Sequence, residues 1–203
     1  MELMELTQGM SPEHAEIITK AAESKGKCFG ITERHGKQVD VSGTSPWMDA
    51  FDQVLESLGV GSIIGLCGGR GTGKTQLAIE AVKAVAMLGG YGSYDRLADF
   101  YMEIKATYRK GSDNDEADVI HRWRLPGLLV LDECHEQAAT PWEKTMLNHL
   151  VDCRYGDMKD TILIANVKAD EFRGMVGPSI SSRMQESGGV IECDWESFRI
   201  RRD

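Results

Sequence analysis

The sequence contains no apolar run that approaches the length of a membrane span, and Met1 to Glu5 lack the basic and apolar stretches of a secretion signal. Its five cysteines are scattered and never form a C-x-x-C pair, which argues against both a zinc site and a disulfide framework. Internal repeats and low-complexity tracts are missing as well. These absences predict a cytoplasmic protein with reduced thiols and no membrane partner.

Basic residues are also in short supply. Lysine and arginine together number 23 against 32 acidic residues, which gives a net charge of −9. The field of the whole molecule therefore repels nucleic acid. Any contact with DNA requires a local basic surface, or several subunits that converge on one strand.

The length and composition fit one α/β domain with a short extra segment. The chain has 203 residues, of which 41% are hydrophobic and 27% charged. Residues 1–45 are expected to form a short helical or irregular segment available for partner binding, with a helix over 11–24 and an irregular or hairpin-like stretch over 25–46. Residues 46–203 are expected to form the main domain.

The most informative motif is Gly68-Gly69-Arg70-Gly71-Thr72-Gly73-Lys74-Thr75, which matches the P-loop pattern G-x-x-x-x-G-K-[ST]. It follows an apolar run at 62–66 and precedes a helix-like segment at 76–88, which is the strand–loop–helix context of true P-loops. Glycines let successive N–H groups turn inward toward an anion, and the helix adds the positive end of its dipole. The residues expected to bind the nucleoside triphosphate are Gly68, Gly69, Arg70, Gly71, Thr72, Gly73, Lys74, Thr75 and Gln76.

A second motif supplies acids for a metal ion and for hydrolysis. Residues 128–131 are apolar throughout and lead directly into Asp132 and Glu133, as in a Walker B motif. Asp132 is expected to hold Mg²⁺ together with Thr75, and Glu133 to orient and deprotonate the attacking water. Acids after strands also serve as helix caps, but their occurrence with a complete P-loop favours ATP hydrolysis.

Two further residues are candidates for the catalytic machinery. Asn166 follows the strand predicted at 161–165, where its amide would lie near the γ-phosphate and help to hold the lytic water. Arg183 is expected to have no acidic partner in its own part of the chain. It therefore suits donation to the γ-phosphate of a neighbouring subunit, as an arginine finger, although a solvated surface arginine would look the same.

Strands and helices alternate along the rest of the chain, which predicts a parallel sheet with helices on both faces and the P-loop at its carboxyl edge. A stripe of apolar residues at 47–58 predicts a helix that either packs in the core or borders the adenine. The other predicted elements are strands near 92–94, 128–131 and 161–165 and helices near 97–108, 116–123 and 142–151.

With these motifs in this order, the chain resembles an AAA+ ATPase, and within that class the DnaC-type replicative helicase loaders. Residues 94–109 resemble the helical element that initiators and loaders insert before Walker B, here placed at about 95–123. Residues 150–155 resemble the helix that ends in an arginine, and Asp194-Trp195-Glu196-Ser197-Phe198-Arg199 resembles the W-[DE]-S-[YF]-R ending. The resemblance implies a parallel five-stranded sheet and no C-terminal lid domain.

The resemblance also implies an ATP-dependent loader that self-associates side by side, binds single-stranded DNA and places a replicative helicase on it. Arg183 matches the finger position, and Arg154 is expected to add a second charge at the subunit junction. Lys105, Arg109 and Lys110 are expected to grip DNA, although they also fit a solvated helix face. Residues 1–45 are shorter than the helicase-binding domain of the family, and Asp132-Glu133-Cys134-His135 departs from the usual D-E-[IL]-G.

Three alternatives stay open. An IstB-type transposition helper shares the ATPase core, and the tryptophan-containing tail favours the loader over it. A P-loop kinase would need a phosphoacceptor pocket and often has an arginine-rich lid, neither of which the sequence indicates. A nucleotide-gated binding module with little turnover would use ATP only to hold its subunits together.

Overall fold

A six-stranded parallel sheet organises the molecule. The computed structural model describes residues 26–32, 45–109, 111, 114–134 and 140–199, so the helix predicted at 11–24 lies outside the described residues. The strands, in chain order, are β1 (Lys27–Phe29), β2 (Ile63–Gly68), β3 (Tyr91–Arg96), β4 (Leu128–Asp132), β5 (Asp160–Ile164) and β6 (Gly189–Cys193). The helices are α3 (Ser45–Ser57), α4 (Lys74–Met87), α5 (Leu97–Thr107), α6 (Glu116–Arg124), α7 (Pro141–Gly156) and α8 (Ala169–Ser187).

The spatial order of the strands is β1-β3-β4-β5-β2-β6, and every neighbouring pair is parallel. The α/β class with a parallel sheet and helices on both faces is confirmed, but the sheet has six strands where five were expected. Neither edge strand, β1 or β6, was among the strands located from the sequence. Strand β1 lies in the stretch expected to be irregular or hairpin-like. It is three residues long and pairs with β3 from Lys27 opposite Tyr91 to Phe29 opposite Ser93.

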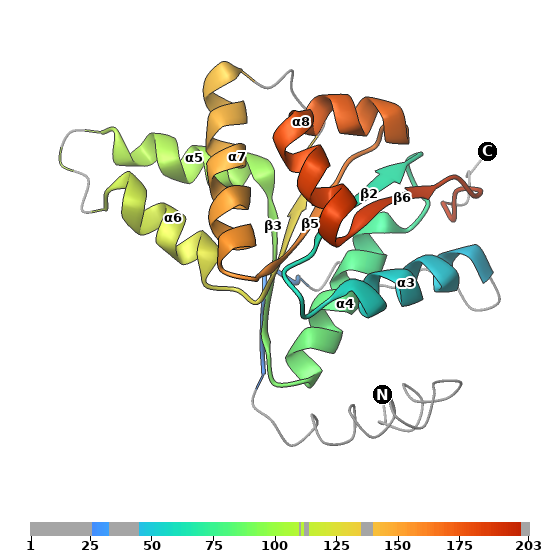
Figure 1. The fold of residues 1–203 in the computed structure, drawn as a ribbon. Helices are drawn as coiled ribbons and strands as arrows, with labels where there is room; N and C mark the ends of the chain where they lie inside the picture. Colours follow the sequence, from blue (N-terminus) through green and yellow to red (C-terminus); the bar gives the residue numbers. More distant parts are fainter. Residues whose placement is uncertain (1–25, 33–44, 110, 112–113, 135–139, 200–203) are drawn as a thin grey trace.

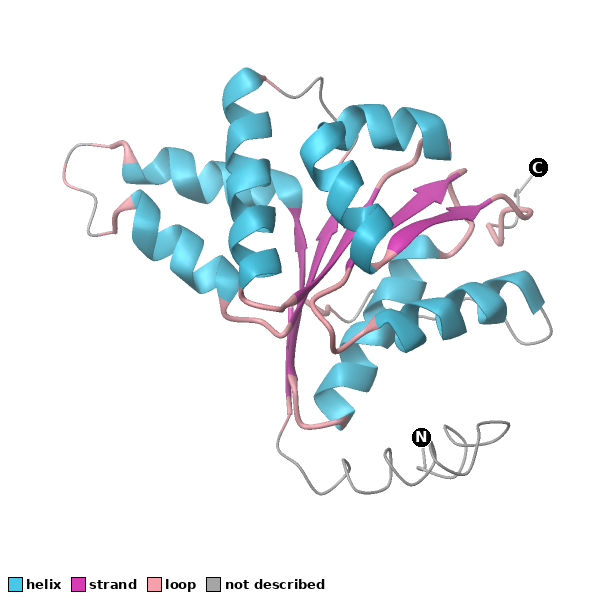
Figure 2. Ribbon diagram, viewed as in Figure 1, coloured by secondary structure: helices cyan, strands magenta, loops and turns pink. Residues whose placement is uncertain are grey.

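Two helical layers cover the sheet, one on each face (Figures 1 and 2). Because successive side chains of a strand point to opposite faces, Leu128 and Val130 of β4 pack toward α3 and α4, while Leu129 and Leu131 pack toward α5, α6, α7 and α8. Strands β2 and β5 divide their side chains in the same way. Continuous apolar runs are what strands buried on both faces require.

Local sequence signals fix where several helices begin and bend. Helix α7 starts at a capping box, in which Thr140 and Glu143 each accept the other's main-chain N–H, with Pro141 at the first turn. Helix α8 is interrupted at Gly177, whose φ of 82° is in the left-handed region, and a second helical stretch follows from Pro178. In the described part of the chain, every helix is too short or too polar to cross a membrane.

The carboxyl ends of the parallel strands meet at one edge of the sheet. The P-loop follows β2, the acids Asp132 and Glu133 lie at the end of β4, and Asn166 follows β5. Since β5 lies between β4 and β2, these three segments are neighbours in the order acids, Asn166, P-loop. The topology thus gathers at one edge residues that are up to about a hundred positions apart in the chain.

Candidate functional site

The P-loop connects the buried strand β2 to the first turn of α4. Gly71 and Gly73 have φ values of 85° and 80°, a left-handed conformation that residues with a Cβ adopt only at a cost. Gly73 is also the N-cap of α4, and no side chain caps this helix end. The main-chain N–H groups of the first turn therefore remain available to an anion, with the helix dipole behind them.

Lys74 is the cation of this loop. Its side chain is buried, and its ammonium donates to the main-chain oxygens of Gly68 (3.0 Å) and Gly69 (2.6 Å) and lies 3.3 Å from Thr72 Oγ1. Burial lowers the pKa of Lys74 because desolvation disfavours its charged form. A buried ammonium surrounded by neutral oxygens is a site that gains from an anionic ligand, so the loop fits a phosphate group.

The other predicted P-loop residues lie around this lysine. Gly69 and Arg70 are exposed at the tip of the loop, while Thr75 and Gln76 are half-buried in the first turn of α4. Nucleotide contact by each of them stays a prediction.

Asp132 is where three donors converge. Its Oδ2 accepts from the Thr75 hydroxyl (2.8 Å) and the Tyr94 hydroxyl (2.7 Å), and its Oδ1 accepts from the Glu133 N–H (2.6 Å). Mg²⁺ usually takes one or two hard oxygen ligands from protein and completes its shell with phosphate and water. The adjoining Thr75 hydroxyl and Asp132 carboxylate fit that requirement.

Tyr94 is a site residue for which the sequence analysis expected no role. It lies on β3 opposite Val130 of β4, and its ring is buried. Burial, followed by the negative charge of Asp132, raises the pKa of Tyr94, so the phenol stays protonated and acts as a donor. The only signal in the sequence is a polar aromatic residue within a buried strand, and its partner could not be identified without the strand register.

Glu133 has an unusual backbone and a cationic neighbour. Its φ of 60° lies in the left-handed region, a conformation that is uncommon for residues other than glycine and is often found at functional sites. Its Oε2 lies 3.5 Å from Nε of Arg96, the N-cap of α5. The ion pair joins the carboxylate predicted to be the base to the end of the neighbouring strand, and the sequence analysis gave Arg96 no role.

Asn166 lies on the loop that follows β5 and is half-buried. Next to it, the carbonyl of Val167 accepts the N–H of Gly68 (2.7 Å), and on the other side the N–H of Cys134 donates to Ile164 (3.0 Å). The main chain around Asn166 is thus bonded both to the start of the P-loop and to the segment after the acids. This position is compatible with the predicted contact to a lytic water.

The expectation that Arg183 has no acidic partner is wrong. Its Nη1 lies 3.0 Å from Oδ1 of Asp152, and its guanidinium packs over the ring of Tyr155 at 5.4 Å from the centroid. Asp152 is 31 positions earlier in the chain and reaches Arg183 because α7 packs against α8. The pair is partly exposed, so it holds Arg183 only weakly.

The expectation for Arg154 is also wrong. Its side chain is fully buried, whereas a charge at a subunit junction must be accessible. Its guanidinium donates to Thr161 Oγ1 (2.9 Å) and to the main-chain oxygens of Trp123 (3.2 Å) and Pro126 (2.9 Å). Arg154 therefore joins the end of α6 and the loop before β4 to strand β5.

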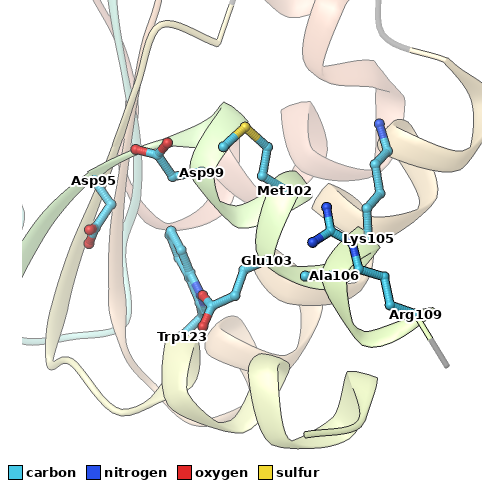
Figure 3. A pocket seen from close by; sticks show the side chains of 8 residues that line it. All are labelled: Asp95, Asp99, Met102, Glu103, Lys105, Ala106, Arg109 and Trp123. Carbon is cyan, nitrogen blue, oxygen red and sulfur yellow. The ribbon is translucent and has the colours of Figure 1, made fainter. Parts of the chain in front are cut away.

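The residues expected to grip DNA line a hollow of about 720 Å³ between α5 and α6 (Figure 3). Lys105 and Arg109 lie at one end of it, and Asp95, Asp99 and Glu103 lie at the other. Lys110 lies outside the described residues. The ammonium of Lys105 is 3.1 Å from Glu143 Oε1, so part of the expected basic surface is neutralised within the protein.

Trp47 of α3 lies in the core. Its ring is buried, stacks on Phe51 with centroids 5.5 Å apart, and donates from Nε1 to the carbonyl of Gly73 (3.3 Å). Of the two roles left open for this helix, the structure shows core packing, directly against the P-loop.

Comparisons with known proteins find similar sequences. The DnaC replicative helicase loader of Escherichia coli K12 is 26% identical over 132 residues, which are 64% of this chain and 54% of the relative. A protein of the same organism, YdaV, is 29% identical over 130 residues, 64% of this chain and 52% of the relative. The chain spans about half the length of these curated relatives.

Solved structures share the fold. A crystal structure of the DnaC helicase loader superposes with a TM-score of 0.65 at 19% identity, covering 79% of this chain and 99% of that one. The replication initiator DnaA bound to AMPPCP and single-stranded DNA superposes with a TM-score of 0.65 at 20% identity, covering 82% of this chain and 52% of that one.

The family described as IstB-like ATP binding protein matches residues 60–203, which is more than half of the chain and includes the P-loop, the acids, Asn166 and Arg183. This chain is a member of the IstB-like ATP-binding protein family and is related to the DnaC helicase loaders.

Proposed function

We propose that this protein is a DnaC-like helicase loader that binds and hydrolyses ATP with Mg²⁺ during DNA replication. Family membership supports nucleotide binding, and the kinship with DnaC supports a role beside a replicative helicase. The observation that carries the proposal is the contact of Thr75 Oγ1 with Asp132 Oδ2 at 2.8 Å, with Glu133 as the next residue. It joins the P-loop and the acids into one site, as ATP hydrolysis requires.

Each residue has a distinct task in this proposal. The N–H groups of the P-loop and the ammonium of Lys74 bind the phosphates, and Thr75 and Asp132 hold the metal. Mg²⁺ held by these two residues would neutralise negative charge on the phosphate oxygens. Glu133 accepts a proton from the attacking water, whose position the Asn166 amide helps to fix.

The test is ATP hydrolysis by the wild type and by Glu133→Gln, measured as phosphate release with and without single-stranded DNA. General bases contribute about 10²–10⁴-fold, so turnover should fall by at least about 100-fold while ATP binding is retained. Glu171→Gln, an exposed change on α8, is the matched control and should hydrolyse ATP like the wild type. If Glu133→Gln is as fast as the wild type, the assigned base is wrong.

Self-association is part of the proposal, with Arg183 of one subunit completing the ATP site of the next. Arg183 is partly exposed, and an ion pair of this kind contributes at most about 1 kcal/mol, so a γ-phosphate can compete for it. Binding of single-stranded DNA and of a replicative helicase are the remaining proposed interactions. Because Lys105 is paired with Glu143, Arg109 is the main described cation at the hollow between α5 and α6 that could contact DNA.

These interactions can be tested with the full chain. Phosphate contacts release counterions, so binding to an oligothymidine strand should weaken steeply with salt if the DNA grip is real. Pull-down with the purified host helicase, with and without ATP, tests the partner. A flat salt response and no capture of the helicase would leave an ATPase whose partners differ from those of a loader.

A second candidate is a nucleotide-gated binding module with little turnover, and the pairing of Glu133 with Arg96 favours it. A base held by a cation is less available to a water molecule. Arg96→Ala distinguishes the two. A slow wild type that Arg96→Ala accelerates supports the gated module, whereas a wild type that hydrolyses readily supports the loader ATPase.

A further inference from the structure

Residues 194–199, here called the tail, follow β6 and lie beside the P-loop (Figure 1). Trp195 Nε1 donates to the carbonyl of Thr72 (2.9 Å), and the main-chain N–H of Phe198 donates to the carbonyl of Gly71 (2.8 Å). From α3, Trp47 Nε1 donates to the carbonyl of Gly73 (3.3 Å). Three consecutive carbonyls of the P-loop are thus held from outside.

Holding a carbonyl also orients the next N–H. A trans peptide unit is planar, with its C=O and N–H pointing to opposite sides. Fixing the carbonyls of Gly71 and Thr72 on the tail side therefore turns the N–H groups of residues 72 and 73 away from the tail. These N–H groups belong to the P-loop stretch that cradles phosphates.

The fit between tail and loop is close. A Cβ on Gly71 would lie 2.1 Å from Ser197 Oγ, and a Cβ on Gly73 would lie 2.8 Å from Trp47 Nε1 and 3.4 Å from a ring carbon of Phe198. The rings of Trp195 and Phe198 are themselves partly buried against the core on the α3 and α4 side. Loop and tail are thus in close contact at Gly71 and Gly73.

We propose that the tail is a positioning element for the P-loop: Trp195 and the N–H of Phe198 orient the loop's amides before the phosphates bind. The inference rests on the proposed ATP binding and adds residues to it that touch no nucleotide. Pre-organised donors bind without a further ordering cost. By linkage, a bound nucleotide must stabilise the tail to the same degree as the tail favours nucleotide binding.

The first test is Trp195→Phe, which keeps an aromatic ring but removes the indole N–H together with the five-membered part of the indole. Binding of ATPγS to the full chain is measured by isothermal titration calorimetry. The loss of one neutral hydrogen bond should raise Kd about three- to tenfold. KM should rise by a similar factor with kcat almost unchanged, since the amides hold the phosphates in ground and transition states alike. Trp142→Phe on α7, remote from the P-loop, is the control and should leave Kd unchanged.

A second pair of variants isolates the main-chain bond. Phe198→Ala and Phe198→Pro both remove the ring. Only proline also removes the main-chain N–H that donates to the carbonyl of Gly71. The proline variant should bind ATPγS about three- to tenfold more weakly than the alanine variant. Thermal unfolding without nucleotide should differ little between them, which separates loop orientation from general stability.

The outcomes distinguish this inference from the proposed function. A wild type that binds no nucleotide would refute the proposed function and this inference together. A wild type that binds while Trp195→Phe matches Trp142→Phe, and while the two Phe198 variants match each other, would overturn the positioning role alone. Parallel losses of affinity in Trp195→Phe and Phe198→Pro would support it.

Discussion

Among single residues, Arg154 has the most demanding environment. It is fully buried, and its planar guanidinium satisfies oxygens at the end of α6, in the loop before β4 and in β5. Burial lowers its pKa to about 10. A lysine, a point charge with three donors, cannot match this fork of five.

Replacing Arg154 with Met should therefore lower the free energy of unfolding by at least about 3 kcal/mol, because it leaves buried carbonyls without donors. Urea unfolding followed by circular dichroism measures the loss. Arg154→Lys, which keeps the charge, should lie between Met and wild type. If Arg154→Met were as stable as the wild type but inactive, a role at the subunit junction would return.

Buried thiols give the protein a predictable weakness at alkaline pH. Burial raises the pKa of Cys134 and of Cys193 from 9.0 to about 12. Between these values the unfolded chain loses the thiol proton while the folded chain keeps it, so stability is complete below about pH 9 and falls as the pH rises. At pH 10, each buried thiol should lower the free energy of unfolding by about 1 kcal/mol.

The measurement is the midpoint of urea unfolding from pH 8 to pH 10.5. Cys134→Ala and Cys193→Ala should each flatten the slope, whatever their effect on stability at pH 8. Cys28→Ala, at an exposed cysteine, is the control. Equal slopes in all three variants would contradict the assignment of the alkaline loss of stability to Cys134 and Cys193.

At the level of elements, the break in α8 separates two helical stretches. Gly177 has a left-handed φ of 82°, while Gly174 lies within the first stretch with open space where a Cβ would be. The backbone conformation therefore favours glycine at position 177 but does not require it at position 174. The second stretch, from Pro178, carries Arg183.

Alanine at the two positions should shift stability in opposite directions. Gly177→Ala should lose about 1–2 kcal/mol because a Cβ disfavours the left-handed conformation. Gly174→Ala should gain about 0.4–1 kcal/mol because it restricts the unfolded chain and favours the helix. Thermal unfolding of both variants tests this, and a stabilised Gly177→Ala would mean that the break is not required.

Elements with strong periodic or motif signals were predictable from the sequence. The strands at 128–131 and 161–165 were recognised because they are uniformly apolar, and the P-loop because its spacing has a chemical reason. Strands β1 and β6 were not predicted. In β1, Lys-Cys-Phe is too short to show a period, and the strand depends on pairing with β3. Short strands are defined by their neighbours, which the local sequence does not contain.

The same limit applies within the site. Lys74, Thr75 and Asp132 were predicted from motif spacing, and the structure brings Thr75, the residue after Lys74, into hydrogen-bond contact with Asp132. The contacts of Tyr94 and Arg96 with the two acids depend on the register between β3 and β4. The partner of Arg183 depends on how α7 packs against α8, which spacing along the chain does not reveal.

On the scale of the whole molecule, the proposed ATP site needs two copies of the chain. Arg183→Ala should keep ATP binding and lose turnover by about 10³-fold or more, by analogy with other arginine fingers. The Lys74→Ala subunit should no longer bind ATP at its own P-loop, but its Arg183 should still complete the ATP site of a neighbouring subunit.

Mixing the two variants should therefore restore part of the phosphate release, at junctions that combine the intact halves. Arg173→Ala, which removes an exposed arginine paired with Asp170 in the same helix, is the matched control and should be active alone. An absence of rescue at every mixing ratio would favour a monomeric enzyme.

The position of β1 has a consequence for communication across the molecule. The chain enters the sheet at Lys27, and the order β1-β3-β4-β5-β2 places three strands between this anchorage and the P-loop strand. At about 4.8 Å per strand spacing, the separation is roughly 19 Å. A protein bound near Lys27 would lie about this distance from the proposed phosphate site. Any effect of its binding on that site would have to be transmitted through the intervening strands.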